Sequence, residues 1–324
     1  MDRLPAHRRA VQTAFERALG PSARLAVTGV TGWLGKALVE MAARAGMTGD
    51  DGQLRVFASK PGRLMLETGT TVELEALAAA APLAGEGWTV AHFAALGKER
   101  TGDLSTEDYV AQSEAVHRAA LRLIAGADRP RLIFASSGAV YGPEGKPPSL
   151  AEEPYGHTKG LHEVALAGWC ETNGVPLTVC RVFNVGGPYG NKLDLYALSS
   201  LMRSALNGGD IPIRAQGSVL RSYVHVEELM AVMVDQVRTA ATGGARPFDS
   251  AGTEVVEIGD LARTVCEQLG QDPTRIERRF DPAAPISRSV GDGTRYQAAV
   301  RRLGLAPIGI ETIVADSIAS LSER

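Results

Sequence analysis

Apolar residues recur at two different spacings along the first half of the chain. Short continuous apolar runs predict buried strands, and the segments between them, with apolar residues every three or four positions, predict helices. The expected strands are 24–29, 54–58, 70–74, 89–94, 131–135 and 177–183, and the expected helices are 33–45, 106–125 and 155–172. Strands that alternate with helices build a doubly wound α/β fold, in which helices cover both faces of a parallel sheet.

The two ends of the chain depart from this alternation. Residues 6–19 carry apolar side chains at helical spacing, and Gly20-Pro21 would end that helix. Beyond Asn184 the alternation loosens. The segments expected there are helices near 195–207, 226–241 and 257–269, and an irregular stretch at 277–295.

We therefore divide the chain into three parts. Residues 1–23 form an N-terminal helical extension, and residues 24–183 together with about 222–252 form the sheet domain. Residues 184–221 and 253–324 form a smaller mixed lobe. Ligands of such folds bind beyond the carboxyl ends of the strands, so we expect the smaller lobe to bind the substrate in a cleft at that edge.

Composition fits an ordinary soluble globular protein. The chain has 324 residues, of which 44% are hydrophobic and 22% charged, enough for a sizeable core. Its formal net charge is -3 and it has no block of Lys and Arg, so we expect neither nucleic acid nor an anionic membrane as a partner. The N-terminal segment has no continuous apolar run, which predicts a cytoplasmic protein without signal peptide or membrane span.

Cysteine usage predicts no metal site. Cys170, Cys180 and Cys266 are widely spaced and match no pattern of metal ligands. We expect them to be buried free thiols of a reducing compartment.

The first expected strand runs directly into TGVTGWLG, which places Gly29, Gly32 and Gly35 in a G-x-x-G-x-x-G spacing. One glycine allows the tight turn, one lets the backbone approach a pyrophosphate, and the last lets the helix pack close to the strand. Between a buried strand and a helix, this spacing predicts a Rossmann dinucleotide site rather than a plain turn. The other loop residues expected at the cofactor are Thr31, Trp33 and Leu34.

The end of the second strand indicates which dinucleotide binds. An NAD site usually has an acidic residue there that holds the ribose hydroxyls. This chain has FASKPGR instead, with Ser59, Lys60 and Arg63. A hydroxyl and two cations suit a 2′-phosphate, which favours NADP, although a solvated basic loop that tolerates NAD stays open.

The segment EPYGHTKGLHE places Tyr155 and Lys159 four residues apart, on the same side of a helix. A free tyrosine has a pKa near 10, and a nearby ammonium would lower it toward the range of an acid–base catalyst. Ser136 and Ser137 follow the fifth strand and emerge at the carboxyl edge of the sheet. By itself, the Tyr/Lys pair would indicate ordinary exposed residues on a helix. Together with the glycine loop and the two serines, it favours an active site.

Several segments, all in the same order, resemble the motifs of one family. The resembling segments are TGVTGWLG, AHFAA (91–95), SSGAVYG, YGHTK, RVFNVGGP (181–188) and GSVLRSYVHVEEL (217–229). They resemble T-G-x-x-G-x-x-G, H-x-A-A, S-S-x-x-V-Y-G, Y-G-x-[ST]-K, R-x-F-N-V-x-G-P and G-x-x-x-R-D-[FY]-[VI]-H-V-D-D-[LA]. The chain thus resembles the extended short-chain dehydrogenases/reductases of the NAD-dependent epimerase/dehydratase family, which act on nucleotide sugars.

The resemblance implies roles for individual residues. It implies Tyr155 as the acid–base residue, Lys159 as its helper and Ser137 as the catalytic hydroxyl, with Ser136 as the fallback and a substrate contact. It also implies that Asn184, Arg221 and Arg288 contact a diphosphate-sugar, that Ala94 and Ala95 contact the cofactor, and that His225 props its segment.

Three positions depart from the family pattern. Gly138 and Ala139 stand where the family's dehydratases have an acidic pair, which disfavours dehydration. Ser113 replaces an asparagine that supports the site, and Thr70 stands at what reads as the acidic position that contacts adenine.

Several functions remain open at this stage. Within the family, the chain is either an epimerase or a reductase of a 4-keto-sugar. Outside it, a reductase of a small non-nucleotide carbonyl and a non-catalytic NADP sensor are the alternatives. Family members pair through two helices equivalent to 106–125 and 156–172, which implies a homodimer. The apolar residues expected at that interface are Val110, Val116, Leu161, Val164 and Trp169.

Overall fold

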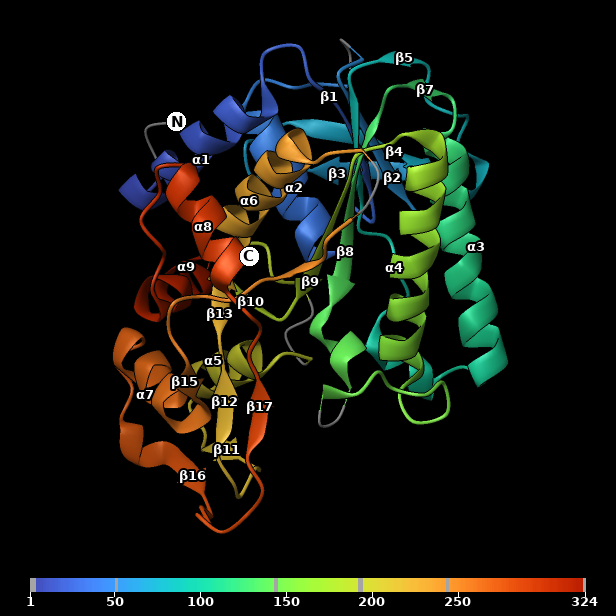
Figure 1. Ribbon diagram of the computed structural model, residues 1–324. Helices are drawn as coiled ribbons and strands as arrows, with labels where there is room; N and C mark the ends of the chain where they lie inside the picture. Colours follow the sequence, from blue (N-terminus) through green and yellow to red (C-terminus); the bar gives the residue numbers. More distant parts are fainter. Residues whose placement is uncertain (1–3, 50–51, 143–144, 192–194, 243–244, 323–324) are drawn as a thin grey trace.

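The computed structural model describes residues 4–49, 52–142, 145–191, 195–242 and 245–322. An α/β domain carries a large sheet, and a smaller lobe of short strands and helices extends from one side of it (Figure 1). The predicted fold class, a doubly wound sheet with a smaller mixed lobe, is confirmed.

The large sheet has eight strands in the order β14-β9-β8-β6-β1-β2-β4-β3. Its strands are β1 (Arg24–Thr28), β2 (Leu54–Ala58), β3 (Gly62–Met65), β4 (Thr71–Ala76), β6 (Trp88–His92), β8 (Arg131–Ser137), β9 (Leu177–Val182) and β14 (Phe248–Asp249). All pairs are parallel except β3 with β4, so seven strands end at one common edge. The sequence prediction missed β3, which is an exposed edge strand without a continuous apolar run.

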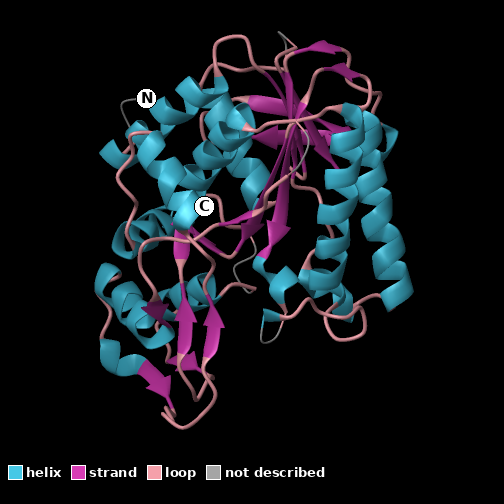
Figure 2. Cartoon of the chain, viewed as in Figure 1, coloured by secondary structure: helices cyan, strands magenta, loops and turns pink. Residues whose placement is uncertain are grey.

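Helices cover both faces of the sheet, as predicted (Figure 2). The helices on one face are α1 (Ala6–Leu19), α2 (Trp33–Arg44) and α6 (Val226–Thr239), and those on the other are α3 (Thr106–Ile124) and α4 (Pro154–Asn173). Each face has its own core, because successive strand residues point to opposite sides: Val27 packs with the first group and Ala26 with the second.

The N-terminal helix α1 begins and ends where the apolar spacing predicted. It packs against α6 and is fixed there by Arg8, whose guanidinium donates two hydrogen bonds of 2.8 Å to Glu227. The Tyr189 hydroxyl and Arg44 bind the same carboxylate. The extension is therefore an integral part of the core beneath the sheet.

The smaller lobe consists of short strands and helices. Its strands are β10 (Asn184–Gly186), β11 (Ile211–Ile213), β12 (Val219–Arg221), β13 (Tyr223–His225), β15 (Val256–Glu257), β16 (Ile276–Arg278) and β17 (Ser287–Ser289). Its helices are α5 (Ala197–Leu206), α7 (Ile258–Gln268) and α9 (Ile310–Ser322), whereas α8 (Thr294–Arg302) packs against α6 and β14 of the sheet domain. Two further strands, β5 (Gly85–Glu86) and β7 (Ala127–Asp128), pair at the far end of the sheet domain. The stretch expected to be irregular, 277–295, thus contains most of β16, all of β17 and the start of α8.

Candidate active site

The glycine loop lies between β1 and α2 and brings backbone close to backbone. Gly29 has φ +75°, and a Cβ there would lie 2.6 Å from the Ala94 nitrogen. A Cβ at Gly35 would lie 2.3 Å from the Gly29 carbonyl oxygen, which keeps α2 tight against the loop. Among the described residues, no side chain caps the N-terminus of α2 at Gly32, so its N–H groups can receive an anion. These features fit the pyrophosphate of a dinucleotide.

The other residues predicted for this loop have different environments. Thr31 is exposed and its carbonyl oxygen accepts a hydrogen bond from Asn191. Trp33 is buried, and its Nε1 donates to the Pro188 carbonyl oxygen at 2.6 Å. Leu34 is half-buried on α2. Trp33 therefore joins the glycine loop to the segment that leads into the smaller lobe.

The predicted 2′-phosphate site lies in the connection from β2 to β3. Ser59 and Lys60 lie in that connection and Arg63 lies on β3, and all three are exposed. Arg63 forms an ion pair of 2.7 Å with Glu73 on β4, which offsets one of the two cations.

Thr70 lies in the turn before β4, at the amino end of that strand. The carboxyl end of β4, where nucleotides bind in such sheets, is at Ala76. The expectation that Thr70 occupies an adenine-contacting position is therefore wrong, because Thr70 precedes the strand and the carboxyl end lies at Ala76, two residues beyond the predicted end at 74.

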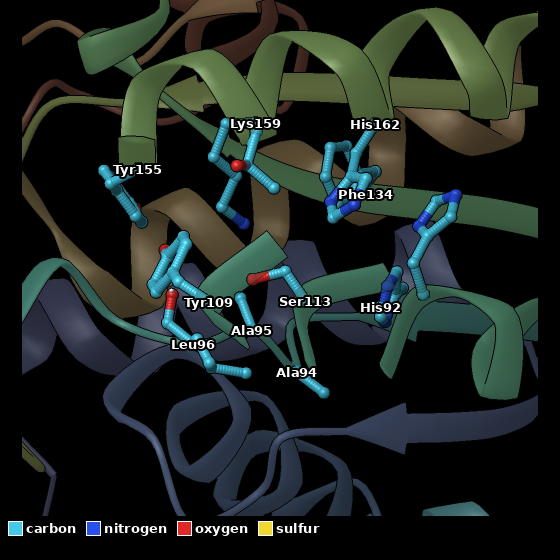
Figure 3. Close-up of a pocket in the computed structure, with 12 residues that line it drawn as sticks. His92, Ala94, Ala95, Leu96, Tyr109, Ser113, Phe134, Tyr155, Lys159 and His162 are labelled. Atoms are coloured by element: carbon cyan, nitrogen blue, oxygen red, sulfur yellow. Dashed lines mark hydrogen bonds between the residues drawn. The ribbon is translucent and has the colours of Figure 1, made fainter. Parts of the chain in front are cut away.

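Helix α4 presents Tyr155, Lys159 and His162 toward one pocket at the carboxyl edge of β6 and β8 (Figure 3). Ala94, Ala95 and Tyr109 line the same pocket. Lys159 is buried, its Nζ donates to the Ala135 carbonyl oxygen at 2.7 Å, and it lies 4.9 Å from the centre of the Phe134 ring. The structure thus brings the predicted acid–base pair together with two predicted cofactor residues.

The protonation of this pair differs from the sequence expectation. Burial raises the pKa of Tyr155, a hydrogen bond with Ser137 opposes the rise, and the nearby Tyr196, Glu99 and Glu153 add to it. The sequence led us to expect that the Lys159 ammonium lowers this pKa; in the fold, that ammonium donates its hydrogen bond to the Ala135 carbonyl oxygen. Burial also lowers the pKa of Lys159 to about 8 against the opposing charge of Glu163.

The two strand-end serines have separate surroundings. Ser136 is buried and its hydroxyl donates to Glu163 Oε1 at 2.5 Å, while Arg181 also binds that carboxylate. Ser137 is half-buried, and its Oγ accepts a hydrogen bond from Ala139 N and interacts with the Tyr155 phenol. Ser136 is thus hydrogen-bonded inside the fold to Glu163, and Ser137 is the serine that faces Tyr155.

The residues expected at the substrate lie in the smaller lobe but are not all together. Asn184 donates to the carbonyl oxygens of Ser222 and Ser289, 3.1 Å each. Arg221 on β12 is half-buried and its guanidinium binds Ser287 on β17. Arg288 is exposed and, being next to Ser287 in the strand, points to the opposite face. The structure therefore separates Arg288 from Arg221.

Among the described residues, one group has the spacing of metal ligands: one atom each from His7, His225 and Asp316 lie within 4.8 Å of one another. The His225 Nδ1 accepts a hydrogen bond from Glu227 N, so the ring proton is on Nε2 and is donated to Asp316 at 3.1 Å. A ring nitrogen must lose its proton to bind a metal ion. These three residues therefore form a hydrogen-bonded clamp between α1, β13 and α9.

Three histidines line the pocket without a role assigned from the sequence: His92 on β6, which stands in the AHFAA segment, His117 on α3 and His162 on α4. His162 stands three residues after Lys159, a spacing that places both on one helix face. That spacing could have indicated from the sequence that His162 lies beside Lys159 in the pocket. No such signal links His117 to the site, since it comes from a separate helix.

The glycine loop, the parallel sheet and the Tyr/Lys helix define the class of extended short-chain dehydrogenases/reductases. Residues 25–248 match the model of the NAD-dependent epimerase/dehydratase family, and this is well over half of the chain. The chain belongs to that family, as its motifs predicted, and the family comprises nucleotide-sugar epimerases, dehydratases and reductases.

Curated relatives match only part of their length. UDP-glucose 4-epimerase of Corynebacterium glutamicum is 26% identical over 215 residues, 59% of this chain and 63% of that protein. The low-salt glycan biosynthesis protein Agl12 of Haloferax volcanii is 27% identical over 180 residues, 53% and 56% of the two chains. The dTDP-4-dehydro-6-deoxy-D-allose reductase of Streptomyces bikiniensis is 35% identical over 119 residues, which are 36% of this chain and 34% of that protein.

Solved structures share the fold over almost the whole chain. The UDP-N-acetylglucosamine 4-epimerase of Methanobrevibacter ruminantium, in complex with UDP-N-acetylmuramic acid, superposes with a TM-score of 0.71 at 20% identity, covering 94% of this chain and 99% of that one. MoeE5 in complex with UDP-glucose and NAD superposes with a TM-score of 0.68 at 21% identity, covering 93% of this chain and 99% of that one. In the described part of this chain, no helix is both long and apolar enough to span a membrane.

Proposed function

We propose that this chain transfers a hydride at a sugar carbon of a nucleoside-diphosphate sugar, with Tyr155 as the acid–base residue. The proposal rests on one arrangement: Tyr155 and Lys159 share a pocket with Ala94, which lies against Gly29 of the glycine loop, and the Ser137 hydroxyl bonds to the Tyr155 phenol. When bound, a nicotinamide dinucleotide supplies the hydride acceptor or donor. Tyr155 moves the proton on the substrate oxygen, Ser137 holds that oxygen, and Lys159 holds the nicotinamide ribose.

A diphosphate substrate is supported by Arg221. Its guanidinium is half-buried and binds only backbone and Ser287 oxygens in the interactions found within the described residues. Burial lowers the pKa of this arginine, which marks a desolvated cation that an anion would stabilise. Three of the proteins named above agree with this substrate class: the UDP-glucose 4-epimerase, the dTDP-4-dehydro-6-deoxy-D-allose reductase, and MoeE5 in complex with UDP-glucose.

Among the family's reactions, we propose epimerisation or 4-keto-sugar reduction rather than dehydration. Gly138 occupies the position where the dehydratases carry an acid, and a Cβ there would lie 2.6 Å from the Phe183 ring. An acidic side chain therefore does not fit without displacing that ring.

For the cofactor, we propose NADP over NAD, on the basis of the exposed Ser59 and Lys60 after β2. The test is the fluorescence change of NADPH and NADH on binding to the wild type and to Lys60→Glu. A reversed preference in Lys60→Glu supports NADP, and a wild type that binds NADH more tightly overturns it.

The quaternary structure is proposed to be a homodimer formed through α3 and α4. Leu161 and Val164 on α4 are 51% and 74% exposed, although both are apolar. Burial of such residues in an interface is favourable. Sedimentation of the protein at micromolar concentration tests this, and a monomer would reject it.

A panel of UDP- and dTDP-sugars and their 4-keto derivatives tests the function. Stoichiometric loss of NADPH absorbance identifies a reductase, and isomerisation without net change of the cofactor identifies an epimerase. Tyr155→Phe is the control and should abolish either reaction while keeping cofactor binding. If the wild type turns over only small carbonyl compounds, or Tyr155→Phe keeps full function, the nucleotide-sugar proposal fails.

A further inference from the structure

Tyr189 connects the N-terminal helix α1 with the segment that contacts the glycine loop. Its backbone has φ +71°, in the left-handed region that a residue with a Cβ rarely adopts. The residue is fully buried and follows Pro188, whose carbonyl oxygen accepts the hydrogen bond of 2.6 Å from Trp33. A strained backbone persists only where its surroundings fix it, and such positions cluster at functional sites.

The Tyr189 side chain is fixed by three helices. Its hydroxyl donates to Glu227 of α6 at 2.8 Å and accepts hydrogen bonds, also of 2.8 Å, from Arg8 of α1 and Arg44 of α2. Its backbone nitrogen donates to the Ser320 hydroxyl of α9 at 3.0 Å. The N-terminal helix, which precedes the residues matched by the family model, thus supplies one of the bonds that hold this strained residue.

The segment 188–191 contacts the glycine loop at a second point besides Trp33. The Asn191 side chain donates to the Thr31 carbonyl oxygen. Thr31 and Trp33 stand on either side of Gly32, at the N-terminus of α2 whose N–H groups can receive an anion. Because the segment is bonded on both sides of Gly32, a shift of the segment moves the N–H groups that would face the pyrophosphate.

We propose that Arg8 and Tyr189 are positioning residues for the dinucleotide, through which the N-terminal helix holds the glycine loop in its binding shape. This inference rests on the cofactor site of the proposed function. When only a fraction of the molecules has the binding shape, the apparent affinity falls by that fraction. Loosening Tyr189 therefore weakens dinucleotide binding without any change in the glycine loop's own sequence.

The first test compares two buried tyrosines that bind neighbouring glutamates of α6. Tyr189→Phe removes the hydroxyl bound to Glu227, and Tyr296→Phe removes a hydroxyl that donates to Glu228, also at 2.8 Å. Both rings are fully buried, so both variants should lower the Tm. Tyr296 lies on α8, which packs against α6 and β14. Only Tyr189→Phe should weaken the affinity for NADPH and NADH, by about five-fold or more, while Tyr296→Phe stays within about two-fold.

The second test compares two arginines of the N-terminal helix. Arg8→Met removes one guanidinium from Tyr189 and leaves Glu227 paired with Arg44 at 2.5 Å, so the buried carboxylate keeps a partner. Dinucleotide affinity should fall by about three-fold or more, measured by fluorescence titration. Arg9→Met is the control, since Arg9 is the next residue on the same helix and is exposed, and its affinity should stay within about two-fold.

A readout without cofactor shows whether the effect reaches the glycine loop. Amide hydrogen exchange of residues 29–35 in the free protein, followed by mass spectrometry, should be about three-fold or more faster in Tyr189→Phe and Arg8→Met. The two control variants should exchange these amides at the wild-type rate. A merely structural role of Tyr189 would lower the Tm and leave this local exchange and the affinity unchanged.

Trp33→Phe tests the last contact, because it keeps an aromatic ring and removes the Nε1 donor. It should weaken dinucleotide binding, and its combination with Tyr189→Phe should weaken binding by less than the product of the two single effects. If Tyr189→Phe keeps the wild-type affinity or the wild-type exchange of 29–35, or if Tyr296→Phe loses as much, the inference is overturned. A wild type that binds neither NADH nor NADPH refutes the proposed cofactor site, whereas the exchange measurement still decides whether the N-terminal helix holds the loop.

Discussion

The Lys159 ammonium is held 2.7 Å from the carbonyl oxygen of Ala135, at the carboxyl edge of β8. This bond fixes a buried cation at the edge of the sheet where the glycine loop also ends. Burial lowers the pKa of Lys159 to about 8, and Glu163 compensates only in part. The site therefore keeps a desolvated charge whose burial opposes folding.

Lys159→Met should stabilise the protein while it abolishes activity. The pKa of Lys159 falls from 10.5 in the unfolded chain to about 8 in the fold, so the folded state binds fewer protons between these values. Below pH 8 the buried charge opposes folding by up to roughly 3 kcal/mol. Thermal unfolding at pH 7 should show a higher Tm for the variant, and its advantage should fade as pH rises from 8 to 10.5. A lower Tm at pH 7 would contradict this balance.

Gly29→Ala should lose dinucleotide binding. At φ +75° an alanine is strained, and its Cβ would lie 2.6 Å from the Ala94 nitrogen, so the loop must open. We expect a loss of stability of about 1–3 kcal/mol and at least a ten-fold (about 1.4 kcal/mol) weaker affinity for NADPH, measured by fluorescence titration.

Gly168→Ala is the matched control for the glycine loop. Gly168 lies inside α4 with nothing within 4 Å of an added Cβ. Alanine there should keep the affinity for NADPH and raise stability by up to about 1 kcal/mol. If both variants bind NADPH with equal affinity, the glycine loop is not part of the cofactor site.

The sequence predicted the parts of the fold that depend on local pattern. β1, α1 and α4 begin and end within about two residues of the predicted limits, since apolar runs and glycines mark them. β3 and β17 were missed because they are exposed and too short to show a period. The role of Ser136 could not be predicted, because it depends on Glu163 from another element, 27 residues away.

Arg221→Met should raise KM for a nucleotide sugar by about ten-fold or more, because it removes a half-buried guanidinium that would bind the diphosphate. Stability should change little, since Arg221 binds only backbone and Ser287 oxygens in the interactions found within the described residues. Arg288→Met is the comparison: this arginine is exposed on the opposite face of β17, and its loss should leave KM within about two-fold. Steady-state kinetics on the substrate found in the panel measure both. Equal effects of the two variants would contradict the placement of the diphosphate at Arg221.

Glu227→Gln should loosen the N-terminal helix in a way that depends on pH. Burial would raise the pKa of Glu227, but the hydrogen bond from Arg8 and the charges of Arg44 and Arg8 outweigh it and lower the pKa to about 2. A carboxylate with a depressed pKa stabilises the fold at every pH above the pKa of 4.5 that it has in the unfolded chain. This contribution is lost as the pH falls from 4.5 through about 2.

At pH 7 the glutamine leaves two buried guanidinium groups without their carboxylate, so we expect a loss of about 3 kcal/mol in urea unfolding. The difference from the wild type should shrink as pH falls toward 2. Glu73→Gln breaks the exposed pair with Arg63, in which both side chains are more than two-thirds exposed, and should cost no more than about 0.5 kcal/mol. A loss for Glu227→Gln that is the same at pH 7 and pH 2.5 would show that the carboxylate's charge is not what holds α1 in place.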